Sequence, residues 1–193
     1  MIARDGASLV NLVVGMTRTG IGYDVHRFAA GRPCILGGVE IPHPVGLDGH
    51  SDADVLCHAL ADALLGAAGE PDIRHFFPPS DPGIRGISSI EILRQVAVRV
   101  AAKGGTIVNV DSTLIAEAPK VLAHVPAMKA KVAAALGLVP SQIGIKATTN
   151  EKMGLLGRQE GIAAMAVAAV DFPCPPSPRR KSVICSNERL PSA

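Results

Sequence analysis

The chain has 193 residues, of which 48% are hydrophobic and 3% are aromatic, and its formal net charge is +2. This length supports one domain with a sizeable core, which must be largely aliphatic. The basic excess lies in residues 173–193, so the charge does not indicate a nucleic-acid-binding surface, and no apolar run is long enough to predict a membrane span.

The chain divides into three predicted segments. Residues 20–172 are expected to form the folded domain, because strand and helix patterns follow one another along them. Residues 1–19 predict a loosely ordered extension that is a poor match to a signal peptide. Residues 173–193 are rich in proline and basic side chains, which is typical of a disordered tail.

The first half of the domain begins with a predicted strand over residues 20–26. Two glycines at the centre of residues 34–41 predict a hairpin between two short strands. A helix is expected over residues 52–67, because its apolar residues recur with helical period and Ser51 or Asp52 can cap its N-terminus.

The second half continues with a predicted helix that begins at Ser88 and carries Glu91 in the position of a capping box. The pattern of residues 161–170 fits either a strand or a helix. The remaining expected elements are a strand over 108–114, a helix over 126–136 and a strand over 143–148.

The four cysteines form no CxxC pair and lack the spacing of a small disulfide-rich domain. This pattern favours free thiols in a reducing compartment. We therefore expect a cytoplasmic protein, or a plastid protein if the source is a plastid-bearing eukaryote.

The predicted strand 20–26 carries the most informative residues. Side chains two positions apart on a strand point the same way, so Asp24 and His26 share one face. The apolar residues at the alternate positions, Ile21, Tyr23 and Val25, are expected to face the core. With His58 as a third ligand, Asp24 and His26 leave a fourth zinc position open, which is typical of a catalytic zinc site.

The predicted helix 52–67 presents Asp54, His58 and Asp62 on one face, at spacings of four residues. Taken alone, this stripe is typical of a solvated face with one histidine. Combined with Asp24 and His26, it favours a metal site, in which Asp54 or Asp62 would accept a hydrogen bond from the far ring nitrogen of His58.

Two polar segments are candidate anion sites. His50 and Ser51 precede the predicted helix, and free N–H groups at a helix N-terminus favour phosphate. Residues 146–152 follow a predicted strand and combine hydroxyl, amine and carboxylate groups, which suits a phosphate with Mg²⁺. An ordinary N-cap and an ordinary polar loop remain the alternatives.

Five motifs lie in a single register along roughly residues 20–171. They are Gly-Tyr-Asp-Val-His-Arg-Phe at 22–28, Leu-Gly-Gly-Val-Glu-Ile-Pro at 36–42, Gly-His-Ser-Asp-Ala-Asp-Val at 49–55, His-Ala-Leu-Ala-Asp-Ala-Leu-Leu-Gly-Ala at 58–67 and Lys-Ala-Thr-Thr-Asn-Glu-Lys at 146–152. Together these motifs resemble those of the 2-C-methyl-D-erythritol 2,4-cyclodiphosphate synthases.

This resemblance implies an α+β fold: a single domain with a four-stranded mixed sheet and helices on one side, assembled as a homotrimer with active sites between subunits. It implies a cytidine diphosphate substrate, 4-diphosphocytidyl-2-C-methyl-D-erythritol 2-phosphate. Its 2-phosphate would attack the β-phosphorus, release CMP and close a cyclic diphosphate, as a step of the non-mevalonate isoprenoid pathway.

The resemblance also implies roles for individual residues. Asp24, His26 and His58 match ligands of Zn²⁺ or another divalent transition metal, and Glu151 matches a ligand of the Mg²⁺ or Mn²⁺ that accompanies the diphosphate. His50 and Thr149 match a pair that stabilises the transition state. The matching substrate-binding residues are Ser51, Asp72, Ile73, Phe77, Asp81, Ala116, Lys120, Val121, Leu122, Thr148, Leu155 and Arg158.

Two residues depart from the family pattern. Arg74 stands where the family usually has glycine, and Leu155 stands where an aromatic residue is often found. Two other functions remain as hypotheses: a zinc phosphohydrolase that uses water as its nucleophile, and a metal-stabilised trimeric binding protein without activity. The predicted cytidine loop argues against the hydrolase, and the pair of His50 and Thr149 argues against the binding protein.

Overall fold

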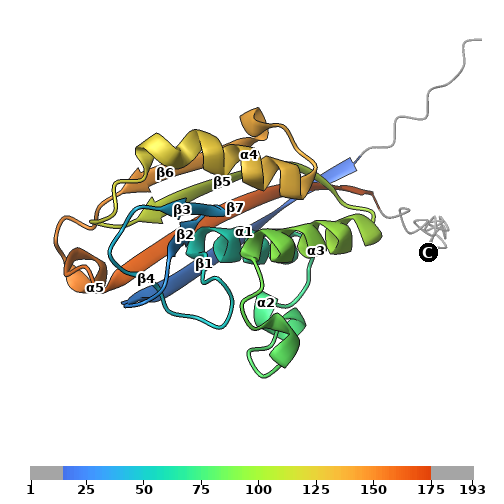
Figure 1. Cartoon of the computed structure of the whole chain (residues 1–193). Helices are drawn as coiled ribbons and strands as arrows, with labels where there is room; N and C mark the ends of the chain where they lie inside the picture. Colours follow the sequence, from blue (N-terminus) through green and yellow to red (C-terminus); the bar gives the residue numbers. More distant parts are fainter. Residues whose placement is uncertain (1–14, 175–193) are drawn as a thin grey trace, which may run out of the picture.

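A main sheet, a two-stranded hairpin and a layer of helices make up the part of the chain that the computed structural model describes, residues 15–174 (Figure 1). In chain order the elements are β1 (Gly15–Ala29), β2 (Cys34–Leu36), β3 (Val39–Ile41), β4 (Gly46–Leu47), α1 (Val55–Ala67), α2 (Ile73–Phe76), η1 (Pro82–Ile84), α3 (Ser89–Ala102), β5 (Thr106–Ile115), η2 (Leu122–His124), α4 (Val125–Leu136), η3 (Pro140–Gln142), β6 (Ile143–Thr148), α5 (Gly154–Gly157) and β7 (Gly161–Pro173).

The main sheet has five strands in the order β4-β1-β7-β5-β6. Only β5 and β6 run parallel, so the sheet is mixed, as predicted. The expectation of four strands is wrong, because the chain after the β2–β3 hairpin returns to the end of β1 and pairs there as the two-residue strand β4. The ambiguous segment 161–170 lies in β7, at the centre of this sheet.

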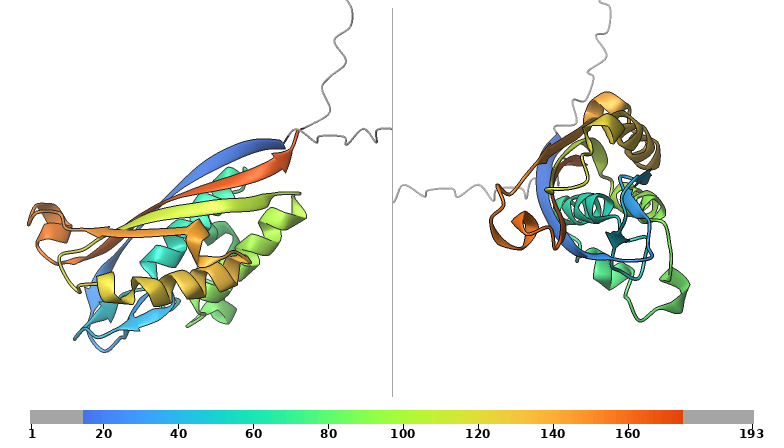
Figure 2. Two further views of the ribbon diagram at one scale, coloured as in Figure 1. Left: turned by 90° about the horizontal axis from the view of Figure 1, so that it is seen from above. Right: turned by 60° about the vertical axis from the view of Figure 1, so that its left-hand side comes forward.

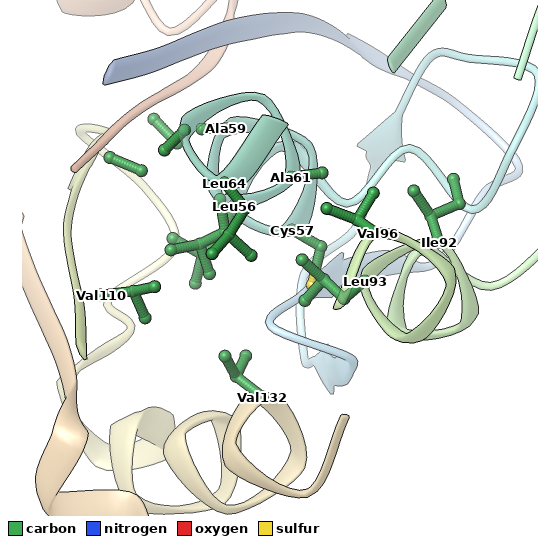
Figure 3. Close-up of a cluster of buried hydrophobic side chains, with 14 of the residues drawn as sticks. Leu56, Cys57, Ala59, Ala61, Leu64, Ile92, Leu93, Val96, Val110 and Val132 are labelled. Atoms are coloured by element: carbon green, nitrogen blue, oxygen red, sulfur yellow. The ribbon is translucent and has the colours of Figure 1, made fainter. Parts of the chain in front are cut away.

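All the long helices cover one face of the sheet (Figures 1 and 2). Helix α1 packs directly on β1 and β7, while α3 packs on α1, and α4 packs on α3 and β6. Their aliphatic side chains meet in one core, which Figure 3 shows for Leu56, Leu64, Leu93, Val110 and Val132. This one-sided arrangement decides which residues of each strand are buried.

The predicted orientation of β1 is wrong. Ile21, Tyr23 and Val25 lie on the face that the helices leave uncovered, with exposed fractions of 68%, 56% and 42%. Asp24 and His26 instead face the helix layer. The alternation along the strand is as predicted, but alternation alone does not say which of two faces a helix will cover.

Helix α1 lies unusually close to β1 because glycines occupy the contact. A Cβ atom on Gly22 would fall well inside contact distance of the Ala59 carbonyl oxygen, and one on Gly20 would collide with that of Ala63. The two glycines therefore let the backbone of α1 approach the strand that carries Asp24 and His26.

Gly22→Ala is expected to destabilise the fold by about 1–3 kcal/mol, because the added methyl group overpacks this contact. Chemical denaturation would measure the loss. Gly66→Ala is the matched control, since a Cβ there meets its nearest atoms at 3.7–3.9 Å, an ordinary contact distance. Equal stability of the two variants would contradict the close-packing explanation.

Both predicted helix caps need correction. Helix α1 begins at Val55 and is capped by Asp54 rather than Ser51 or Asp52, because Ala53 adopts a left-handed backbone conformation (φ 58°) that a helix cannot include. Helix α3 (Ser89–Ala102) has Ser88 at its N-cap, as predicted, but the Ser88 side chain makes no capping bond, so the predicted capping box is absent. The Asp52 carboxylate accepts the Ser89 N–H instead.

Strand β1 begins at Gly15, earlier than the predicted residue 20, and β7 extends to Pro173. The rest of the predicted extension and tail, residues 1–14 and 175–193, lies outside the described residues. Across residues 15–174, no helix combines the length and the apolar character that crossing a membrane requires.

Candidate metal centre and active site

The structure brings the three predicted metal ligands together where β1 meets α1. Asp24 and His26 point from β1 toward the helix layer, and His58 lies in the first turn of α1. Asp24 Oδ2 lies 2.8 Å from His26 Nε2 and 2.9 Å from His58 Nδ1, and the two ring nitrogens are 3.2 Å apart. The three ligand atoms therefore converge on one point.

This donor set fits a divalent transition metal such as zinc. Imidazole nitrogen and carboxylate oxygen are both ordinary zinc ligands, and three of them leave one position for water or substrate. If His26 Nε2 and His58 Nδ1 both carried protons, their approach to 3.2 Å would be unfavourable, because two N–H donors would face each other. The geometry is therefore that of a metal-binding cluster.

The far nitrogens of both rings have fixed partners. His26 Nδ1 lies 2.5 Å from the Asp48 carbonyl oxygen, so this nitrogen donates its hydrogen and leaves Nε2 free for the metal. His58 Nε2 lies 3.1 Å from Ser51 Oγ and 3.0 Å from Ser89 Oγ, both of which are buried. Metal-bound histidines in proteins are oriented in this way.

The expected role of Asp54 and Asp62 beside His58 is therefore wrong. Asp54 is fully buried and accepts hydrogen bonds from the N–H groups of Gly37, Gly38 and Cys57, which join the β2–β3 turn to α1. Asp62 accepts from the Ile73 N–H at 2.8 Å. Asp54 caps α1 because the helix starts later than the sequence pattern indicates, and Asp62 faces the first residue of α2.

The electrostatics of the cluster favour ionised Asp24. Burial by itself would raise the pKa of Asp24, but hydrogen bonds and charge from His26 and His58 outweigh burial and hold that pKa well below its usual range. For His26, burial lowers the pKa, while the bond to Asp24 and its charge raise it by more. Asp62 differs, since burial raises its pKa.

A cavity of about 500 Å³ opens beside the metal ligands. It is lined by Asp24, His26 and His58 together with five of the predicted catalytic and substrate-binding residues, His50, Ser51, Asp72, Ile73 and Phe77. The unusual Arg74 lines it as well. Asp81 lines an adjoining cavity of about 650 Å³ that shares His50 and Ser51 with the first.

His50 and Ser51 lie in the loop before α1 and not at its N-terminus, because the helix begins at Val55. The predicted helix-dipole contribution at His50 is therefore not available from α1. Arg32 holds this loop instead, by donating to the carbonyl oxygens of Gly49 and Ser51 at 2.6 Å each. Sequence reasoning did not single out Arg32.

The remaining predicted residues gather at the carboxyl ends of the parallel strands β5 and β6. Thr149 donates a hydrogen bond to Glu151 Oε1 at 2.7 Å, so these two side chains meet in the turn after β6. Glu117 ties the two loops together by accepting from the Asn150 and Lys152 N–H groups at 3.1 and 3.0 Å.

These loops do not line the cavity beside the metal ligands. Lys120, Leu122, Thr148 and Leu155 are exposed, whereas Val121 is buried and Ala116 is partly buried. Arg158 pairs with Glu160 at 2.6 Å. Within one chain, the predicted site residues therefore form two separate groups, which we call the metal group (Asp24, His26, His50, Ser51, His58, Asp72, Ile73, Phe77 and Asp81) and the loop group (Ala116, Lys120, Val121, Leu122, Thr148, Thr149, Glu151, Leu155 and Arg158).

A one-sided α+β fold with an Asp-His-His cluster beside a cavity is the arrangement expected of a metalloenzyme with an open metal position. Residues 17–171 match the model of the YgbB family, and the chain belongs to this family. A 2-C-methyl-D-erythritol 2,4-cyclodiphosphate synthase from Akkermansia muciniphila is 60% identical over 156 residues, which cover 80% of this chain and 92% of the relative.

Solved structures show the same fold. IspF of Plasmodium falciparum in a complex with CDP has a TM-score of 0.71 at 31% identity. The match covers 82% of this chain and 97% of the Plasmodium chain. The bifunctional IspDF of Campylobacter jejuni has a TM-score of 0.79 at 40% identity and covers 82% of this chain. The present chain spans 43% of that bifunctional protein.

Proposed function

We infer that this protein converts 4-diphosphocytidyl-2-C-methyl-D-erythritol 2-phosphate to 2-C-methyl-D-erythritol 2,4-cyclodiphosphate and CMP, in the non-mevalonate isoprenoid pathway. The reaction is an intramolecular phosphoryl transfer, and the enzyme is a CMP-releasing, cyclising phosphorus–oxygen lyase. The inference rests on the name of the 60% identical relative, together with the Asp-His-His cluster beside a cavity.

The substrate carries its own nucleophile, so the protein has to position two phosphates and neutralise their charge. Asp24, His26 and His58 would hold Zn²⁺ or another divalent transition metal, and Glu151 would hold Mg²⁺ or Mn²⁺ with the diphosphate. These ions supply positive charge to the phosphate oxygens. His50 and Thr149 would stabilise the transition state by contacting the reacting phosphates.

The remaining predicted residues would bind the rest of the substrate. Ser51, Asp72, Ile73 and Phe77 line the cavity and would contact the methylerythritol phosphate portion, with Asp81 next to it. Arg158 would pair with a phosphate after releasing Glu160. The cytidine would lie against the loop that contains Ala116, Lys120, Val121 and Leu122, with Thr148 and Leu155 nearby.

A homotrimer would bring the metal group and the loop group together. One chain holds them apart, so a site that needs both requires a second chain. The uncovered face of the sheet offers the surface for this contact, because Ile21 pairs with Val167 and Tyr23 with Met165 across β1 and β7. All four are exposed apolar side chains on adjacent strands, as expected of an interface.

Val167→Lys is expected to separate the subunits and to lower turnover in parallel, because it places a charge in the centre of this apolar face. Sedimentation velocity would measure the mass and CMP release the activity. Val98→Lys is the control, since Val98 is exposed on α3, in the helix layer. A fully active Val167→Lys monomer would contradict an inter-subunit site.

Phosphorus NMR of the products would test the reaction. The cyclic diphosphate together with CMP supports the cyclodiphosphate synthase. Linear phosphate products would instead support the zinc phosphohydrolase, and substrate that stays unchanged with metal bound would support the binding protein.

A further inference from the structure

Ser89 and Asp52 lie behind the metal cluster, on the side of the His58 ring that faces away from Asp24. Ser89 is the first residue of α3 and is fully buried. Its Oγ lies 3.0 Å from His58 Nε2, whereas Asp24 contacts Nδ1 on the opposite side of the same ring. The loop before α1 and the start of α3 therefore meet at this histidine.

Asp52 controls the direction of the hydrogen bonds of Ser89. Asp52 Oδ2 accepts the Ser89 N–H at 2.9 Å, and Asp52 Oδ1 accepts the Ser89 hydroxyl. An ionised carboxylate can only accept, so the hydroxyl hydrogen of Ser89 is directed at Asp52. The Ser89 oxygen then presents a lone pair to His58, and Nε2 has to be the donor.

We propose that Asp52 and Ser89 form a positioning pair that holds the His58 ring with its hydrogen on Nε2 and an unprotonated Nδ1 toward the metal. A neutral imidazole carries one hydrogen, so a donor at Nε2 leaves the lone pair on Nδ1. Nδ1 is the nitrogen that lies in the cluster with Asp24 and His26. This proposal rests on the metal centre of the proposed function.

Ser51 touches the same nitrogen but has a different role. Its Oγ accepts the Ala53 N–H at 3.0 Å and lies 3.1 Å from His58 Nε2. Because both of these contacts use the oxygen as acceptor, the hydroxyl hydrogen of Ser51 is left to donate, and Ser51 lines the cavity. Ser51 thus faces the substrate, while Ser89, directed by Asp52, holds the ligand.

Two variants separate hydrogen-bond direction from packing. Ser89→Ala removes one of the two acceptors of the His58 N–H and leaves only Ser51 Oγ, which Asp52 does not direct. Asp52→Asn keeps the size of the side chain but replaces one acceptor by an N–H₂ group. If the N–H₂ group faces the Ser89 N–H, two donors oppose each other and the contact is lost. If it faces the Ser89 hydroxyl, it turns the hydroxyl hydrogen toward His58. Both variants should weaken the metal-binding form of the ring.

Zinc affinity measured by chelator competition is expected to fall about 10–100-fold in both variants, the usual cost of losing a partner behind a ligand. Ser88→Ala is the matched control, because Ser88 is the exposed neighbour whose side chain makes no capping bond, and its affinity should equal that of the wild type. In zinc-loaded protein, the His58 Nε2–H proton resonance should shift and exchange faster with solvent in Ser89→Ala.

Wild-type affinity and an unchanged His58 resonance in Ser89→Ala would overturn the proposal. If Ser89→Ala fails to fold, Asp52→Asn tests the proposal instead. Wild-type zinc affinity in Asp52→Asn would also overturn the proposal. Absence of stoichiometric zinc from the wild-type protein is a different result, because it would remove the proposed metal centre itself.

Discussion

Replacing His58 by alanine is expected to remove bound zinc and turnover together. His58 supplies one of three converging ligand atoms, and Asp24 and His26 alone cannot complete a three-ligand site. Losing the hydrogen-bond partner of a metal ligand typically lowers metal affinity about 10–100-fold. Losing the ligand His58 itself should lower zinc affinity by more than this. Elemental analysis after dialysis would measure the metal, and CMP release would measure the activity.

His43→Ala is the control for this experiment. His43 bonds to the Val45 carbonyl oxygen at 2.8 Å and does not line the cavity beside the metal ligands. Circular dichroism should show that both variants stay folded. Stoichiometric zinc with full turnover in His58→Ala would show that the assignment of the metal ligands is wrong.

Thr149→Val is expected to lower kcat by on the order of 10²-fold or more while substrate binding changes little, because a donor to developing charge acts mainly in the transition state. Valine keeps the shape of threonine and removes only the hydroxyl group. Single-turnover kinetics with a separate measurement of substrate Kd would separate the two effects. Thr17→Val, at the far end of β1, controls for the loss of a surface hydroxyl.

The contact between Thr149 and Glu151 requires a companion variant. The Thr149 hydroxyl donates to Glu151, so Thr149→Val also changes the surroundings of that carboxylate. Glu151→Gln should mainly raise the Mg²⁺ concentration needed for activity, because an amide is a weaker Mg²⁺ ligand than a carboxylate. Normal turnover in Thr149→Val, or weaker binding alone, would make Thr149 a wall of the pocket.

Local patterns were sufficient to predict most elements, and the three candidate metal ligands that they indicated converge in the structure. Alternation along β1 places Asp24 and His26 on one face at two-residue spacing, whatever the rest of the chain does. The apolar period of residues 52–67 predicts a helix that carries His58. The loop roles of Thr149, Glu151 and Arg158 came from the family resemblance, since polar loops after strands are too common to indicate a site.

Only the tertiary structure decided which face of β1 is buried and what lies behind the ligands. A strand pattern has two faces, and the helix layer covers the one with Gly20 and Gly22, where a backbone can approach. Ser89 and Asp52 lie in segments whose patterns indicate nothing more than caps. They meet His58 because α3 packs on α1, a contact between residues 31 positions apart that no local period encodes.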